Sequence, residues 1–102
     1  MGKLTIQRKE DAGRAILKLD GRLDTNTSLD LQEALDKEWE TPHDITLDFE
    51  SLSYMSSAGL RVILSTQKKA TAQNTDFRLV NVSEPVLEVL DVVGFLEFIQ
   101  VD

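Results

Sequence analysis

The stretch Ile45–Leu64, ITLDFESLSYMSSAGLRVIL, decides the fold because it changes from the pattern of a strand to the pattern of a helix. Its first five residues, Ile45–Phe49, predict a buried strand. After the break, apolar residues recur at helical spacing and predict an amphipathic helix; they are Leu60, Ile63, Leu64 and Ala70. Ser56 or Ser57 can cap this helix, because serine is a favoured N-cap residue. The stretch therefore predicts a strand, a tight turn with two adjacent serines, and a helix.

The segments on either side extend this unit into one α/β domain. Strands over Leu4–Arg8 and Ala15–Leu19, joined by a turn with Gly13, predict a hairpin, and Asp20–Asp24 breaks the strand pattern. The next helix has Asp24, Thr25 or Asn26 as its cap and an apolar face of Leu31, Ala34, Leu35 and Trp39. The elements expected after the second helix are a strand over Phe77–Val80, a helix that starts at Ser83–Pro85 and ends before Gly94, and a short strand within Phe95–Val101.

The order ββαβαβα, with a further β at the end, predicts the architecture. The strand–helix–strand units favour parallel pairing, and the hairpin adds an antiparallel edge. We expect a single domain over residues 1–102, with a mixed, mostly parallel sheet of four to five strands packed with three or more helices.

The composition excludes several classes of function. The net charge of −7 argues against a nucleic-acid partner and against adsorption to anionic membranes. The absence of cysteine excludes disulfides, thiol catalysis and cysteine-based zinc sites. The sequence has no apolar run of membrane-spanning length and no signal peptide pattern. We therefore expect a cytoplasmic protein.

The serine pair has three interpretations: cap, nucleophile or switch. A nucleophile elbow has the pattern G-x-S-x-G, of which Met55–Gly59 keeps only the second half. The only histidine, His43, precedes the strand, and a five-residue strand spans about 17 Å, so His43 is too far away to act as a base. A hydrolase is therefore disfavoured.

Small residues at Ala58 and Gly59 leave the approach to the serines open, although glycine costs roughly 1 kcal/mol of helix propensity.

A carboxylate metal site is a weaker hypothesis. Asp20, Asp24 and Asp48 could converge at one edge of the sheet, where three acids can in principle hold magnesium. Exposed acids at turns and caps are common, however, so we expect no metal, no cofactor and no enzymatic activity.

Three stretches together resemble the STAS domain family, specifically the bacterial anti-sigma factor antagonists. Gly21–Asp24 resembles the family's G-x-L-D turn after the second strand, and Val86–Phe98 resembles its last helix and the following turn. Leu47–Leu60 resembles the central strand and loop, whose family pattern is roughly D-L-x-x-[VL]-x-[FY]-[MI]-D-S-[SA]-G-L. The order of the elements agrees with the family along essentially the whole chain.

The resemblance implies a phosphorylation switch. In the family, an anti-sigma factor that is also a serine protein kinase phosphorylates the serine after the usual aspartate, and a serine phosphatase resets it. The unphosphorylated antagonist binds the anti-sigma factor and frees the sigma factor. Carried over, the phosphoserine falls on Ser57, with Ser56 as the alternative, and Ser56 itself replaces the usual aspartate. The implied switch and partner-binding patch comprises Asp24, Asp48, Ser56, Ser57, Ala58 and Gly59.

The missing aspartate keeps a second interpretation open. The chain would then be a STAS adaptor that is not phosphorylated and acts in a transporter or a larger signalling assembly.

Overall fold

Five strands form one sheet in the order β1-β2-β3-β4-β5 in the computed structural model, which describes residues 3–92, 94 and 100–101. The strands are β1 (Leu4–Asp11), β2 (Arg14–Leu23), β3 (Asp44–Met55), β4 (Phe77–Val80) and β5 (Gln100–Val101). The helices are α1 (Thr27–Glu38), α2 (Ser57–Gln73) and α3 (Glu84–Val92). This order confirms the sequence prediction, including a short last strand, while residues 95–99 of the predicted strand segment lie outside the described residues.

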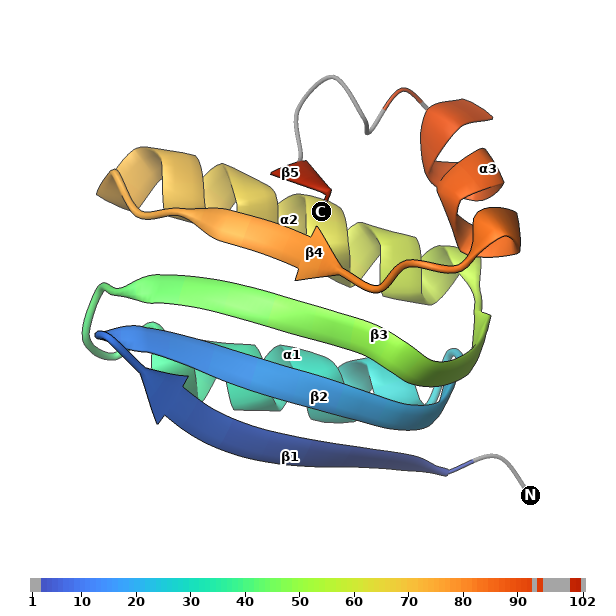
Figure 1. Ribbon diagram of the computed structural model, residues 1–102, viewed down its shortest axis with the longest axis horizontal. Helices are drawn as coiled ribbons and strands as arrows, with labels where there is room; N and C mark the ends of the chain where they lie inside the picture. The colour runs from blue at the N-terminus through green and yellow to red at the C-terminus, as the bar shows by residue number, and fades with distance from the viewer. Residues whose placement is uncertain (1–2, 93, 95–99, 102) are drawn as a thin grey trace.

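The sheet is mixed, as expected. β1 and β2 pair antiparallel through a turn at Ala12 and Gly13, both of which have positive φ. The pairs β2–β3, β3–β4 and β4–β5 are parallel. The carboxyl ends of the parallel strands β2 and β3 therefore lie at one edge of the sheet, which is the edge from which α1 and α2 start (Figure 1).

The core lies between the sheet and two helices. Figure 1 shows α1 and α2 behind the sheet, on the same face, and α1 contacts β1 and β2 while α2 contacts β3 and β4. Alternate strand residues are buried on this face: Leu17, Leu19, Ile45, Leu47, Phe49, Phe77 and Leu79. The helices contribute Leu31, Leu35, Val62, Ile63 and Ala70, and Trp39, the C-cap of α1, is buried with them. Buried apolar area of this kind supplies most of the stabilisation.

Both central strands are longer than predicted. β2 continues through Asp20 to Leu23, because Gly21 adopts a φ of +118° that side chains rarely adopt. A Cβ at Gly21 would lie 2.0 Å from the carbonyl oxygen of Lys3, which accepts a hydrogen bond from the Arg22 N–H at 3.1 Å. Gly21, in the segment predicted to break the strand, therefore lets Lys3, just before β1, approach β2 closely.

β3 runs to Met55 rather than ending at Phe49. Its register against β2 shifts after the Lys18–Asp48 pair and again after the Gly21–Leu52 pair. These irregularities interrupt the alternation of apolar and polar residues, which is why the pattern indicated an early end.

An ionic cluster ties the strand starts together at the edge opposite the serines. The Asp76 carboxylate accepts hydrogen bonds from Arg14 at 2.5 Å and from Arg78 at 2.8 Å. The Asp76 N–H donates to the Asp44 carboxylate at 2.8 Å, and Arg14 also donates to the Thr46 hydroxyl at 3.0 Å. The cluster therefore links the beginnings of β2, β3 and β4.

Candidate functional site

The serine turn is held by hydrogen bonds to its neighbours. Ser56 has extended backbone angles and is the N-cap of α2, and its side chain accepts from the Gly59 N–H at 3.5 Å. The Ser56 N–H donates to the carbonyl oxygen of Leu23 at 2.8 Å. The start of α2 is thus joined to the end of β2, and of the two serines predicted as possible caps, Ser56 is the N-cap.

Ser57 is the first residue of α2 and has a different environment from Ser56. It is exposed, whereas Ser56 is half-buried. Within the described residues its hydroxyl makes no hydrogen bond, so the side chain is free to meet another molecule. Of the two candidate hydroxyls, one stabilises the helix start and the other faces solvent.

The packing of the core requires a glycine at position 59. Gly59 is buried, and a Cβ there would lie 2.7 Å from Cδ2 and 2.8 Å from Cγ of Leu23, and 3.0 Å from Cγ of Met55. Leu23 is itself fully buried. The interpretation that Gly59 keeps the approach to the serines open is therefore corrected: its absent side chain lets the first turn of α2 pack on the end of β2.

Asp24 lies beside the serine turn, because it directly follows Leu23. One carboxylate oxygen accepts from the N–H groups of Asn26 at 3.0 Å and Thr27 at 2.9 Å, and from the Thr27 hydroxyl at 3.1 Å. The hydrogen bond from the Thr27 backbone is the largest cause that lowers the pKa of Asp24, and the nearby Arg22 charge also lowers it. Asp24 is therefore an anion at the start of α1, while Asn26, the formal N-cap, makes no side-chain cap bond.

Asp48 lies elsewhere. It pairs with Lys18 and Val80 in the middle of the sheet, and its carboxylate accepts from the Glu50 N–H and the Asn81 side-chain amide, both at 3.0 Å. The strand continues for seven residues beyond Asp48, to Met55, a span of about 20 Å. The expectation that Asp48 lies near the serines was wrong, because the strand was predicted to end just after it.

An apolar surface that the sequence analysis missed adjoins the turn. A hollow of about 200 Å³ separates the end of β3 from α3, lined by Leu52, Ser53, Tyr54, Met55, Ser83, Pro85, Val86 and Val89. Tyr54 and Val89 are each 42% exposed, and Val92 is 86% exposed. The Arg22 guanidinium stacks on the Tyr54 ring at 4.2 Å from its centroid.

The nucleophile hypothesis fails on geometry. His43 immediately precedes β3 and Ser56 immediately follows it, so the whole twelve-residue strand separates them. The His43 ring instead contacts the Thr41 carbonyl oxygen at 2.6 Å and the Glu38 carboxylate at 2.9 Å. In the part of the chain that the structure describes, no three acidic or histidine side chains are grouped as a metal site.

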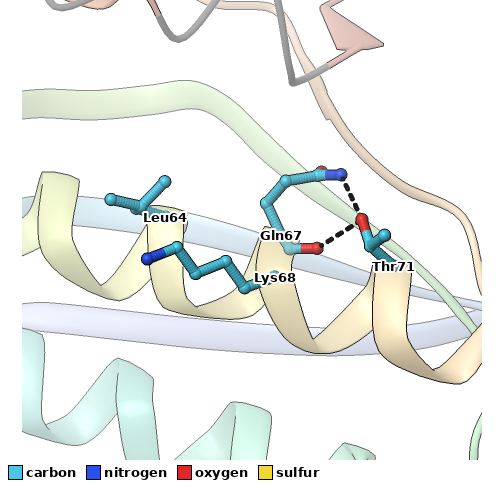
Figure 2. Close-up of a pocket in the computed structure, with 4 residues that line it drawn as sticks. All are labelled: Leu64, Gln67, Lys68 and Thr71. Carbon is cyan, nitrogen blue, oxygen red and sulfur yellow. Dashed lines mark hydrogen bonds between the residues drawn. The ribbon is translucent and has the colours of Figure 1, made fainter.

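A second hollow, of about 370 Å³, lies along α2 and away from the serines. Figure 2 shows four of its lining residues: Leu64, Gln67, Lys68 and Thr71. The Gln67 side-chain amide donates to the Thr71 hydroxyl at 3.3 Å, and that hydroxyl donates to the Gln67 carbonyl oxygen at 3.1 Å (Figure 2). The Thr71 hydroxyl and the Gln67 amide nitrogen are thus engaged with each other along the helix.

The family model of the STAS domain matches residues 3–102. The chain belongs to the STAS domain family. This STAS domain is 29% identical over 102 residues to the anti-sigma F factor antagonist of Paenibacillus polymyxa, with 96% of this chain and 86% of the relative covered. No described helix is long and apolar enough to cross a membrane.

Solved structures share the fold of this STAS domain. An anti-sigma factor antagonist from Mycobacterium paratuberculosis matches with a TM-score of 0.86 and 17% identity, covering 97% of this chain and 85% of that one. The Bacillus cell fate determinant SpoIIAA in its phosphorylated form matches with a TM-score of 0.75 and 20% identity, covering 96% and 91%.

Proposed function

We propose that this STAS domain is a bacterial anti-sigma factor antagonist controlled by phosphorylation of Ser57. The unphosphorylated form binds an anti-sigma factor that is also a serine kinase, and the sigma factor is released. The kinase transfers the terminal phosphoryl group of ATP to the Ser57 oxygen, so that a P–O bond to ADP is replaced by one to Ser57 and the hydroxyl proton is lost. A serine phosphatase reverses the modification with water. The domain itself has no enzymatic role and acts in the cytoplasm.

The observation that supports Ser57 over Ser56 is their different surroundings. The Ser57 hydroxyl is exposed and unbonded among the described residues, whereas the Ser56 side chain caps α2 and its N–H is tied to Leu23. A kinase must take the hydroxyl into its own active site. Modifying Ser57 requires no bond of the turn to break, while modifying Ser56 would disturb the cap.

The electrostatics explain why modification would switch binding off. A phosphate adds nearly two negative charges and three acceptor oxygens. The start of α2 tolerates it, because free backbone N–H groups point toward this end. The fold is therefore kept, and phosphorylation weakens the complex instead. The partner would dock on the apolar surface around Tyr54 and Val89, beside Asp24 and a new dianion. The dianion repels acidic groups of the partner and resists desolvation.

Site mapping tests the proposal. The protein is mixed with ATP and the cognate anti-sigma factor kinase and then analysed by mass spectrometry. We expect one phosphoryl group on Ser57, none in Ser57→Ala, and continued modification of Ser57 in Ser56→Ala. A phosphate on Ser56 alone, or none on either serine, would contradict the proposal.

One observation favours a second candidate, a STAS adaptor that is not phosphorylated. Ser56 stands where the family pattern has an aspartate, so the acid before the switch serine is absent. Partner binding that is tight and equal in the native protein and in Ser57→Asp would support the adaptor over the switch.

A further inference from the structure

The charges of the three helices are distributed unevenly. The α2 segment carries three cations, Arg61, Lys68 and Lys69, and has no acidic residue. The other two helices are mainly acidic, with Asp30, Glu33, Asp36 and Glu38 in α1 and Glu84, Glu88 and Asp91 in α3. In a chain of net charge −7, the helix that begins at Ser57 is thus the cationic one.

Arg61 lies on the same side of α2 as Ser57. Residues four apart on a helix are neighbours, with Cβ atoms about 5–6 Å apart. Both side chains are exposed, and the opposite side of the helix is buried through Gly59, Val62, Ile63, Thr66 and Ala70. Helical side chains lean toward the N-terminus, so the long Arg61 side chain extends over the turn that contains Ser57.

The Arg61 guanidinium has no other engagement among the described residues. It makes no hydrogen bond or ion pair there, in contrast to Arg8, Arg14 and Arg78, which bind carboxylates. Arg22 is a second described cation near the turn, but its guanidinium is stacked on the Tyr54 ring. Arg61 is therefore the better placed of the two to meet a group on Ser57.

We propose that Arg61 is the residue that holds the phosphate of phosphorylated Ser57, forming a phosphate–guanidinium pair across the first turn of α2. The inference rests on the proposed function and deepens it by naming how the modified state is organised. A guanidinium presents paired N–H donors that match two phosphate oxygens. The modification then does two things at once: it adds an anion to the docking surface and removes a free cation from it.

The test is independent of any natural kinase. Phosphoserine is incorporated at position 57 during translation, and the second ionisation of the phosphate is titrated by ³¹P NMR. The ordinary pKa of this ionisation is about 6. The pair favours the dianion, so Arg61→Gln is expected to raise the phosphate pKa by about half a unit or more relative to the native chain. The backbone N–H groups at the helix start remain in both proteins, so the difference isolates the guanidinium.

Three variants make the outcome decisive. Arg61→Lys keeps the charge and is expected to restore most of the native phosphate pKa. Lys69→Gln removes one positive charge from the same helix, twelve residues from Ser57, which is beyond the screening length of physiological salt, and is expected to have no effect. Equal phosphate pKa values in the native protein and Arg61→Gln would overturn the proposal, as would an equal shift in Lys69→Gln. If the phosphate pKa rises in Arg22→Gln but not in Arg61→Gln, the residue that pairs with the phosphate is Arg22 instead.

Failure of the two proposals can be told apart. If the kinase leaves Ser57 unmodified while the Arg61 variants change the pKa of the incorporated phosphoserine as expected, only the proposed function fails. If Ser57 is phosphorylated by the kinase and the Arg61 variants leave the phosphate pKa unchanged, only the pairing fails.

Discussion

The N–H of Ser56 donates to the carbonyl oxygen of Leu23 at 2.8 Å and joins the start of α2 to the end of β2. Because Asp24 follows Leu23, this one bond brings an acid, a capping serine and an exposed serine to the same edge of the sheet. Leu23 also fills the space that Gly59 leaves open. The position of Ser57 is thus fixed by backbone pairing and by a close contact in the core.

The contact between Gly59 and Leu23 predicts a loss of stability in Gly59→Ala. The added methyl group would meet fully buried Leu23 at 2.7 Å, and overpacking of a core costs about 1–3 kcal/mol. Alanine returns up to about 1 kcal/mol of helix propensity, so we expect a net loss of about 1–2 kcal/mol in the free energy of unfolding, measured with urea. The control Ser65→Ala changes an exposed residue of the same helix and should leave stability unchanged or slightly higher. A Gly59→Ala protein as stable as Ser65→Ala would contradict the packing argument.

We expect the Asp24 carboxylate to make a pH-dependent contribution to the free energy of unfolding. Its pKa in the folded protein lies below the ordinary 3.8, mainly because the Thr27 backbone N–H binds the ionised form. This contribution is therefore fully present above pH 3.8 and is lost as the pH falls through the lower folded value. We expect urea unfolding between pH 2 and 6 to show a weaker acid destabilisation in Asp24→Asn than in the native protein. Asp20→Asn, at an exposed residue of β2, serves as the control. Equal acid profiles for the native protein and Asp24→Asn would rule out this assignment.

We expect that breaking the ionic cluster of Asp76, Arg14 and Arg78 lowers stability but leaves the phosphorylation of Ser57 unchanged. Burial is the largest single influence on the Asp76 carboxyl and raises its pKa, but the hydrogen bonds and positive charges of Arg14 and Arg78 together outweigh it, and the net pKa is lowered. We expect Asp76→Asn to lose about 1 kcal/mol of unfolding free energy at pH 7, since the side chain is 35% exposed and solvent screens the pairs.

Phosphorylation of Ser57 in Asp76→Asn should proceed at the native rate at a temperature where the variant is fully folded. A native-like stability would show that the cluster contributes nothing, and a slowed kinase reaction would show that the two edges are coupled.

Much of this arrangement could be predicted from the chain, and the errors have a common physical cause. The helix faces and the hairpin followed from periodicity, and the capping of α2 followed from the preference of serine for the N-cap position. The errors lie where register irregularities and long-range contacts override the local pattern. The segment Asp20–Asp24 was predicted to break the strand, although β2 continues to Leu23 with Gly21 in a conformation that favours glycine. Asp48 was placed at a strand end, although β3 continues for seven more residues.

The apolar surface illustrates a further limit. Tyr54 and Val89 are far apart in sequence and come together only because α3 packs beside the end of β3. No periodicity within either element marks the two as one surface. The only available signal was the apolar content of α3, where just one residue, Leu90, is buried.

The affinity of the cognate anti-sigma factor for the native protein before and after phosphorylation tests the central claim most directly. Calorimetry with the unmodified protein, with phosphoserine at position 57 and with Ser57→Ala gives the three dissociation constants. Like charges brought together in an interface cost several kcal/mol, so we expect the phosphorylated form to bind at least about 100-fold more weakly, with Ser57→Ala binding like the unmodified protein. Equal affinities for the phosphorylated and unphosphorylated forms would contradict a switch at Ser57.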